Sequence, residues 1–133
     1  MKQNILKENA RRSSGEAGYE MNELNENEFW FVVGSQSLYG SEVLETVARR
    51  GEEMALKMSE SLPCRLVSRG TVKTAEEAEA VIKEANRSDK CCGIVTWCHT
   101  FSPSKMWIEG LNLLQKPYCH FATQYNRSIP WDE

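Results

Sequence analysis

Hydrophobic positions beyond residue 28 change their spacing from one segment to the next. The first run, residues 29–33, is apolar at every position and ends at Gly34. A strand that is apolar on both faces is typical of a parallel sheet with helices on both sides. The pattern therefore predicts a buried strand over residues 29–33.

Apolar residues of the next segment recur about every 3.6 positions, which predicts a helix that ends at Pro63. Ser41 is the expected N-cap, with Glu42 at the positive end of the helix dipole. Glycine inside a helix costs about 1 kcal/mol relative to alanine, so we expect Gly51 to permit a close contact with the sheet. The expected buried face consists of Val43, Leu44, Val47, Ala48, Gly51, Met54, Ala55, Met58 and Leu62.

Three further strands and two further helices follow by the same reasoning. Residues 64–68, 91–98 and 118–123 have strand composition. A capping box of Thr74 and Glu77 begins one helix, and Ser102 followed by Pro103 begins the other. The expected buried positions of these helices are Ala78, Val81, Ile82 and Ala85, then Met106, Trp107, Gly110, Leu111 and Leu114. Alternating strands and helices with right-handed crossovers predict an α/β fold with a doubly wound parallel sheet.

Ligands of doubly wound sheets bind at the carboxyl ends of the strands. Three loops are expected there, over residues 34–40, 99–103 and 124–131. The sequence stops on a loop that leaves a strand, so we interpret the sheet as incomplete at the C-terminus.

The loop over residues 34–40 has neither the G-x-G-x-x-G pattern nor the lysine of a P-loop. Its serines and backbone amides precede a helix N-terminus and could hold the phosphate of a flavin or of a sugar phosphate. The alternative is a plain connection in which Leu38 and Tyr39 pack locally.

His99 and His120 each follow a cysteine, a pattern that can indicate a metal site. They are expected near opposite ends of neighbouring strands, so we predict buried structural residues rather than zinc ligands. Cys91 and Cys92 are neighbours on a strand and should be small core residues on opposite faces. The sequence contains no nucleophile elbow and no acid pair placed for acid–base catalysis.

The segment 1–28 has few apolar side chains, and they are scattered without a sustained period. Such a segment cannot bury enough apolar area to offset the entropy cost of ordering it. We therefore predict a disordered tail over residues 1–28 and one domain over residues 29–133.

Composition narrows the function classes. The 133 residues suit one domain, and the formal net charge of −3 argues against a nucleic-acid binder that relies on positive charge. No apolar run approaches the about 20 residues of a membrane span, so neither nucleic acid nor membrane is an expected partner. The five cysteines are an odd number without a C-x-x-C pair, which favours a reducing cytoplasm.

Four stretches have a more specific pattern: FWFVVGSQSLYG (29–40), LPCRLV (62–67), CCGIVTWCHTFSPSKMWIEGL (91–111) and QYNRSIPWD (124–132). Through them, residues 29–133 resemble the N-terminal region of the L-arabinose isomerase family. The resemblance implies a flavodoxin-like fold, a homo-oligomer and a role in L-arabinose degradation. The implied reaction is the aldose–ketose isomerisation of L-arabinose to L-ribulose, with a divalent metal, typically manganese.

The family's G-S-Q-x-L-Y-G loop contributes to the sugar pocket, which implies that Gln36, Leu38 and Tyr39 bind substrate here. Ser37 and Ala122 stand where many members have histidine. The family's metal ligands and proton-transfer residues lie in domains with no counterpart in this chain. The resemblance thus implies a fragment without catalytic or metal-binding residues, inactive alone; the alternative is a flavodoxin-like binding module without chemistry.

Overall fold

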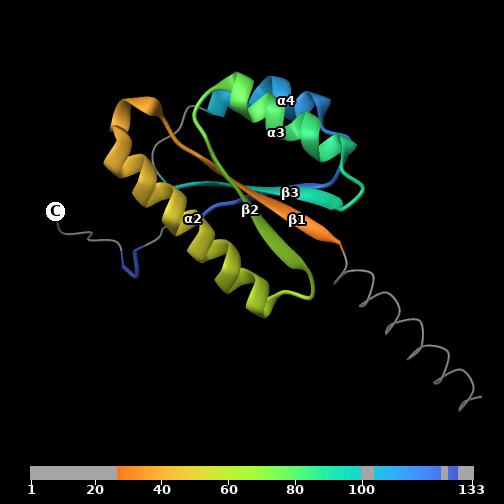
Figure 1. Cartoon of the computed structure of the whole chain (residues 1–133), viewed down its shortest axis with the longest axis horizontal. Coiled ribbons are helices and arrows are strands. Elements are labelled where there is room, and N and C mark those ends of the chain that lie inside the picture. The colour runs from red at the N-terminus through yellow and green to blue at the C-terminus, as the bar shows by residue number, and fades with distance from the viewer. Residues whose placement is uncertain (1–26, 100–103, 124–125, 129–133) are drawn as a thin grey trace, which may run out of the picture.

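The computed structural model describes residues 27–99, 104–123 and 126–128. Within them, four strands form one all-parallel sheet in the order β2-β1-β3-β4. Their bounds are Glu28–Gly34 (β1), Arg65–Val72 (β2), Cys91–Cys98 (β3) and Tyr118–Phe121 (β4). This order matches the first four strands of the flavodoxin-like arrangement (Figure 1). The prediction of a doubly wound α/β fold is confirmed.

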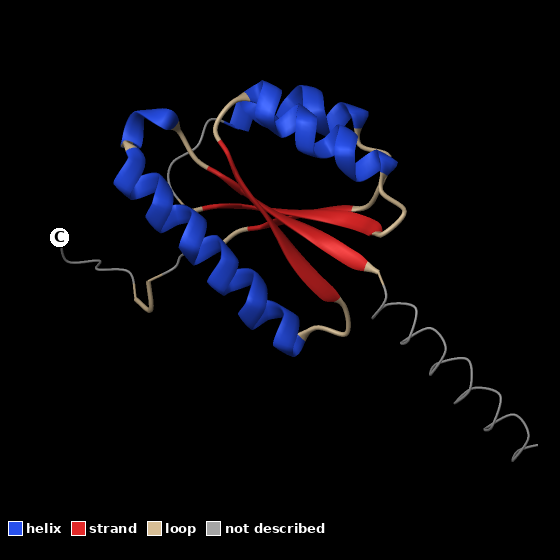
Figure 2. Cartoon of the chain, in the orientation of Figure 1, coloured by secondary structure: helices blue, strands red, loops and turns tan. Residues whose placement is uncertain are grey.

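Helices cover both faces of the sheet. The long helix α2 (Ser41–Ser61) lies on one face, while α3 (Ala75–Arg87) and the short α4 (Ile108–Leu113) lie on the other (Figure 2). Two 3₁₀ turns, η1 (Ser37–Tyr39) and η2 (Ser104–Trp107), precede α2 and α4. No helix among the described residues is long and apolar enough to cross a membrane.

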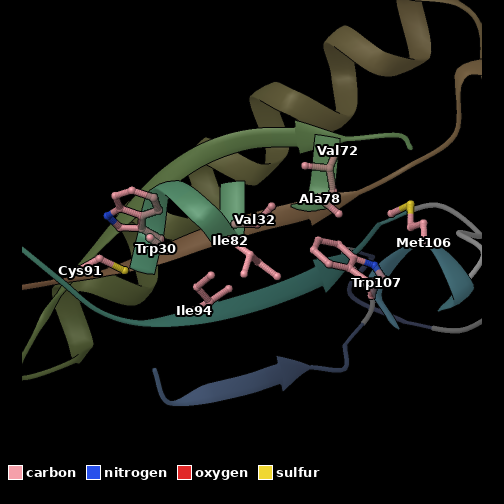
Figure 3. Packing of buried hydrophobic residues seen from close by; sticks show 10 residues of the cluster. Trp30, Val32, Val72, Ala78, Ile82, Cys91, Ile94, Met106 and Trp107 are labelled. Carbon is pink, nitrogen blue, oxygen red and sulfur yellow. The ribbon is translucent and has the colours of Figure 1, made fainter. Parts of the chain in front are cut away.

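Strand β1 supplies side chains to both hydrophobic cores. Trp30 and Val32 belong to the cluster beneath α3 and η2, whereas Phe31 and Val33 belong to the cluster beneath α2. This alternation is the period of two expected for a strand. The larger cluster is shown in Figure 3 and contains Trp30, Val32, Val72, Ala78, Ile82, Ala85, Cys91, Ile94, Met106 and Trp107.

Helix α2 approaches the sheet closely at Gly51, as predicted. Gly51 is buried, and a Cβ atom at this position would lie only 2.7 Å from Cγ2 of Val33. Two of the residues expected on the buried face are instead exposed, Val43 by 40% and Leu62 by 45%. Val43 lies in the first turn of α2, and Leu62 is an extended residue just past its last turn. Helical periodicity alone does not indicate where the helix passes beyond the sheet.

The start of α2 also differs from the prediction. Gly40 is the N-cap, with a φ of 81°, and Ser41 is already the first helical residue. The carbonyl of Gly40 accepts the first helical hydrogen bond, from the amide of Leu44 at 3.1 Å. A positive φ is readily reached by glycine, so the turn that ends η1 shifts the cap to Gly40.

The capping box of α3 is confirmed in its first half. The amide of Glu77 donates to Oγ1 of Thr74 at 3.2 Å, while the carboxylate of Glu77 accepts from the amide of Lys73 at 2.7 Å. The return bond therefore reaches one residue further back than the expected pattern.

Strand β2 is longer than the predicted 64–68 because it contains an irregularity. The register against β1 shifts between Phe31 and Val33, and Gly70 has a φ of 82°. A bulge of this kind lets a strand continue in pairing after an extra residue. Strand β4 is shorter than predicted, and β1 begins one residue earlier, at Glu28. The remaining tail residues 1–26 and the predicted helix start at Ser102 and Pro103 lie outside the described residues.

We predict that Trp107→Ala lowers the free energy of unfolding by about 3–5 kcal/mol, because the indole fills a core site. Trp107 is 7% exposed and belongs to the larger cluster (Figure 3). Ile108→Ala is the control. Ile108 follows Trp107 in the sequence, but its side chain is 55% exposed, so we expect its free energy of unfolding to change by no more than about 0.5 kcal/mol. Urea unfolding of the two variants measures the difference, and equal effects would contradict the assigned packing.

Candidate functional site

The carboxyl ends of β1 and β3 lie side by side in the middle of the sheet. From β1 the chain continues to α2 on one face, and from β3 to η2 and α4 on the other. Chain connections thus diverge to opposite faces between these two strands. In doubly wound sheets this divergence opens a crevice in which ligands bind.

The predicted sugar-binding residues lie together in the connection after β1. The amide of Tyr39 donates to the carbonyl of Gln36 at 3.3 Å, and the amide of Gly40 donates to that of Ser37 at 3.4 Å. Gln36, Leu38 and Tyr39 therefore share one tight turn, which we call the 36–39 turn. Gln36 and Tyr39 are half-buried, while Leu38 is 76% exposed.

The base of the 36–39 turn is anchored to the sheet. Ser35 is fully buried, and its amide donates to the carbonyl of Val72 at the end of β2, at 2.9 Å. The alternative of a plain connection in which Leu38 and Tyr39 pack locally is wrong for Leu38, which is exposed, whereas Tyr39 is half-buried. The hypothesis that this loop holds a phosphate stays a prediction.

A depression of about 360 Å³ lies between the first half of α2 and the end of β3. We call it the α2–His99 depression. It is lined by Glu42, Val43, Thr46, Val47, Arg50 and His99. None of the three predicted sugar-binding residues lines it, so the sheet edge presents two distinct features, the 36–39 turn and this depression.

Interactions on two sides define the position of His99. Its ring stacks on Trp97, with centroids 4.9 Å apart and an interplanar angle of 10°, and Trp97 in turn stacks on Phe31. Nη1 of Arg50 lies 2.6 Å from Nε2 of His99. A guanidinium can only donate, so Nε2 accepts and the neutral ring carries its proton on Nδ1.

Burial lowers the pKa of His99 below its ordinary value, and the charge of Arg50 lowers it further. The prediction of a buried structural residue is therefore wrong in part. His99 does pack on the core through Trp97, but it is half-buried and lines a depression.

His120 is exposed, against the prediction of a buried residue. Its Nδ1 lies 2.8 Å from Oγ1 of the buried Thr96, and the hydroxyl of Tyr118 lies 2.9 Å from the same oxygen. Strand β4 lies at the end of the described strand order, and Tyr118, Cys119 and His120 are all exposed. The sequence pattern of β4 did not distinguish such a strand from a covered one.

Cysteine predictions are partly confirmed. Cys91 is buried, its thiol donates to the carbonyl of Gly93 at 3.4 Å, and burial raises its pKa. A buried thiol of this kind behaves as a small apolar residue. Cys92 is only half-buried.

The sequence reasoning missed Arg50 and Glu42 as site residues. The only signal was their spacing, because Glu42, Thr46 and Arg50 recur every four positions and so form one line along the helix surface. The partner of Arg50 is His99, 49 positions further along the chain. Only the packing of α2 beside the end of β3 brings these two side chains together.

Comparison with known proteins identifies the family. Residues 23–133 match the family described as the L-arabinose isomerase N-terminal domain. The chain belongs to this family. Proteins named L-arabinose isomerase from Bacteroides thetaiotaomicron and Erwinia tasmaniensis are 49% identical over 113 residues and 51% identical over 114 residues. Each alignment covers 84% of this chain, but only 22% and 23% of the respective relative.

The protein of the same name from Oceanobacillus iheyensis is 51% identical over 111 residues, which are 82% of this chain and 23% of that relative. The chain therefore spans less than a quarter of the length of these L-arabinose isomerases. The matched region is their N-terminal domain, as the expected resemblance implied.

We predict that the stability of this domain decreases below about pH 6.5 because of His99. The pKa of His99 is lowered in the folded chain, so the unfolded chain takes up a proton first as the pH falls. The contribution of His99 to the free energy of unfolding is fully present above the pKa that His99 has in the unfolded chain. It is lost as the pH falls towards the lower pKa that His99 has in the folded chain.

Urea unfolding of the chain between about pH 7.5 and 5 measures this dependence. His99→Gln should remove the His99 component, while His120→Gln, which changes the only other histidine, should retain it. An unchanged pH dependence in His99→Gln would contradict the assigned environment of the ring.

Proposed function

We propose that this chain is the N-terminal part of an L-arabinose isomerase and that the 36–39 turn contributes to its sugar pocket. Family membership and the identity of the relatives support the enzyme class. The single observation that carries the role of the turn is its exposure at the carboxyl edge of the sheet. Leu38 in particular is 76% exposed, as expected of a side chain that completes a pocket formed with another part of the enzyme.

Each residue of the turn has a specific role in this proposal. The amide of Gln36 donates and accepts hydrogen bonds, which suits the vicinal hydroxyls of a sugar. Tyr39 offers a hydroxyl and an apolar ring face, and Leu38 forms a wall against the carbon chain. A homo-oligomer, in which a second subunit completes the pocket, and a cytoplasmic location are further parts of the proposal.

The reaction of the whole enzyme would be the isomerisation of L-arabinose to L-ribulose, which moves a proton between adjacent carbons. A divalent cation such as manganese would polarise the sugar oxygens during this step. Within the described ranges, no three His, Cys, Asp or Glu side chains are placed to hold a metal ion. In this proposal the turn contributes substrate binding, and the rest of the enzyme supplies the metal ligands and the proton-transfer residues.

We predict that the purified chain does not form L-ribulose from L-arabinose, with or without manganese. Addition of the remaining domains of the Erwinia tasmaniensis relative as a separate chain should restore ketose formation. A partial pocket should bind free sugar with a dissociation constant in the millimolar range or weaker. The binding free energy is then about −4 kcal/mol or closer to zero. A colorimetric ketose assay measures the activity, and L-ribulose formation by the chain alone would overturn the proposal.

In the complemented enzyme, Gln36→Ala should raise KM by roughly threefold to tenfold, through loss of hydrogen bonds to the sugar. Gln115→Ala is the matched control, because Gln115 is an exposed glutamine that follows α4, outside the turn. Equal effects of the two substitutions would argue against the turn. Binding of sugar by the chain alone clearly more tightly than the millimolar range would favour the non-catalytic binding module.

A further inference from the structure

The α2–His99 depression is separate from the turn that carries the proposed function. It lies against one face of α2 beside the end of β3, at the divergence of the chain between β1 and β3. Its volume of about 360 Å³ lies within the range of small-molecule pockets. Its lining combines the polar residues Glu42, Thr46, Arg50 and His99 with the apolar Val43 and Val47.

The polar groups form a line along α2. Glu42, Thr46 and Arg50 are spaced by four residues, so the Cα atoms of Glu42 and Arg50 lie about 12 Å apart along the helix axis. The hydroxyl of Thr46 donates to the carbonyl of Glu42 at 3.0 Å, so its oxygen can act as an acceptor towards a ligand. Glu42 thus begins the line, Thr46 lies midway, and the Arg50–His99 pair ends it.

The apolar part lies along the same helix. Val47 is fully buried beneath the depression, while Val43 is 40% exposed, an unusual fraction for a valine on the expected buried face. Val43 is therefore the side chain that carbon-bound hydrogens of a ligand can contact, with Val47 beneath it. The exposure of Val43, which helical periodicity did not predict, is explained by its position on the wall of this depression.

We propose that the α2–His99 depression binds a neutral polyol, such as a pentitol, through Glu42 and Arg50, with His99 holding the guanidinium of Arg50 in position. A simple anion or a simple cation would be matched at only one end, because Glu42 and Arg50 carry opposite charges. A hydroxyl group can donate to Glu42 or accept from Arg50. A chain of hydroxyl-bearing carbons therefore satisfies both ends, with its C–H groups against Val43.

NMR titration of the 133-residue chain with xylitol tests the proposal, because xylitol has no carbonyl and cannot be isomerised. We expect saturable shifts of the methyl signals of Val43 and Val47 and of the His99 ring, with a millimolar dissociation constant. Arg50→Met should weaken binding about tenfold, the cost of a hydrogen bond to a charged group. Glu42→Gln tests the other end of the depression. Glu42 is exposed, and this substitution should weaken xylitol binding several-fold.

Arg49→Met is the matched control. Arg49 is the adjacent arginine of α2, but it pairs with Glu53 at 2.7 Å on the exposed side of the helix. This variant should bind xylitol like the unmodified chain, although it loses the same charge.

Three results would overturn the proposal. Saturable shifts with sodium phosphate but not with xylitol would identify an oxyanion site. Xylitol shifts confined to the 36–39 turn, abolished by Gln36→Ala and unaffected by Arg50→Met, would assign polyol binding to the turn alone. That result would leave the proposed function supported. The absence of any saturable shift with either probe would show that the depression does not bind these ligands.

Discussion

Burial of β1 on both faces is the constraint on which the rest of this domain depends. Phe31 and Val32 are completely buried, on opposite faces, and β1 pairs with β2 on one side and β3 on the other. Each hydrophobic core is therefore built on alternate residues of the same strand. A polar side chain in either register would remain unsatisfied between the sheet and a helix, which is costly in an apolar environment.

The position of the candidate site follows from this packing. Gly51 allows α2 to approach Val33 of β1 closely, and this approach places the line of Glu42, Thr46 and Arg50 beside the end of β3. On the β3 side, the stack from Phe31 through Trp97 to His99 continues from the core to the depression. Both walls of the depression are thus supported by contacts with the same central strand.

The 36–39 turn has a different physical character. Its base is held by buried Ser35, but its apolar tip is exposed and contacts no cluster of the described core. An exposed leucine next to a half-buried tyrosine gains little stability for the isolated domain. In the proposed function, contacts with other parts of the enzyme compensate this exposure; the chain spans less than a quarter of the length of the relatives that it matches.

Much of this architecture was determined by the sequence alone, because it depends on local periodicity and composition. The apolar run of β1, the helical period of α2 and the Thr74 cap of α3 predicted the doubly wound sheet, and the literal family motif indicated Gln36, Leu38 and Tyr39. Contacts between distant segments could not be predicted in this way. The Arg50–His99 pair, the exposure of Val43 and His120, and the extension of β2 past its bulge depend on register and on which surfaces meet. Periodicity specifies which residues share a face, but only tertiary packing decides what that face contacts and where the contact ends.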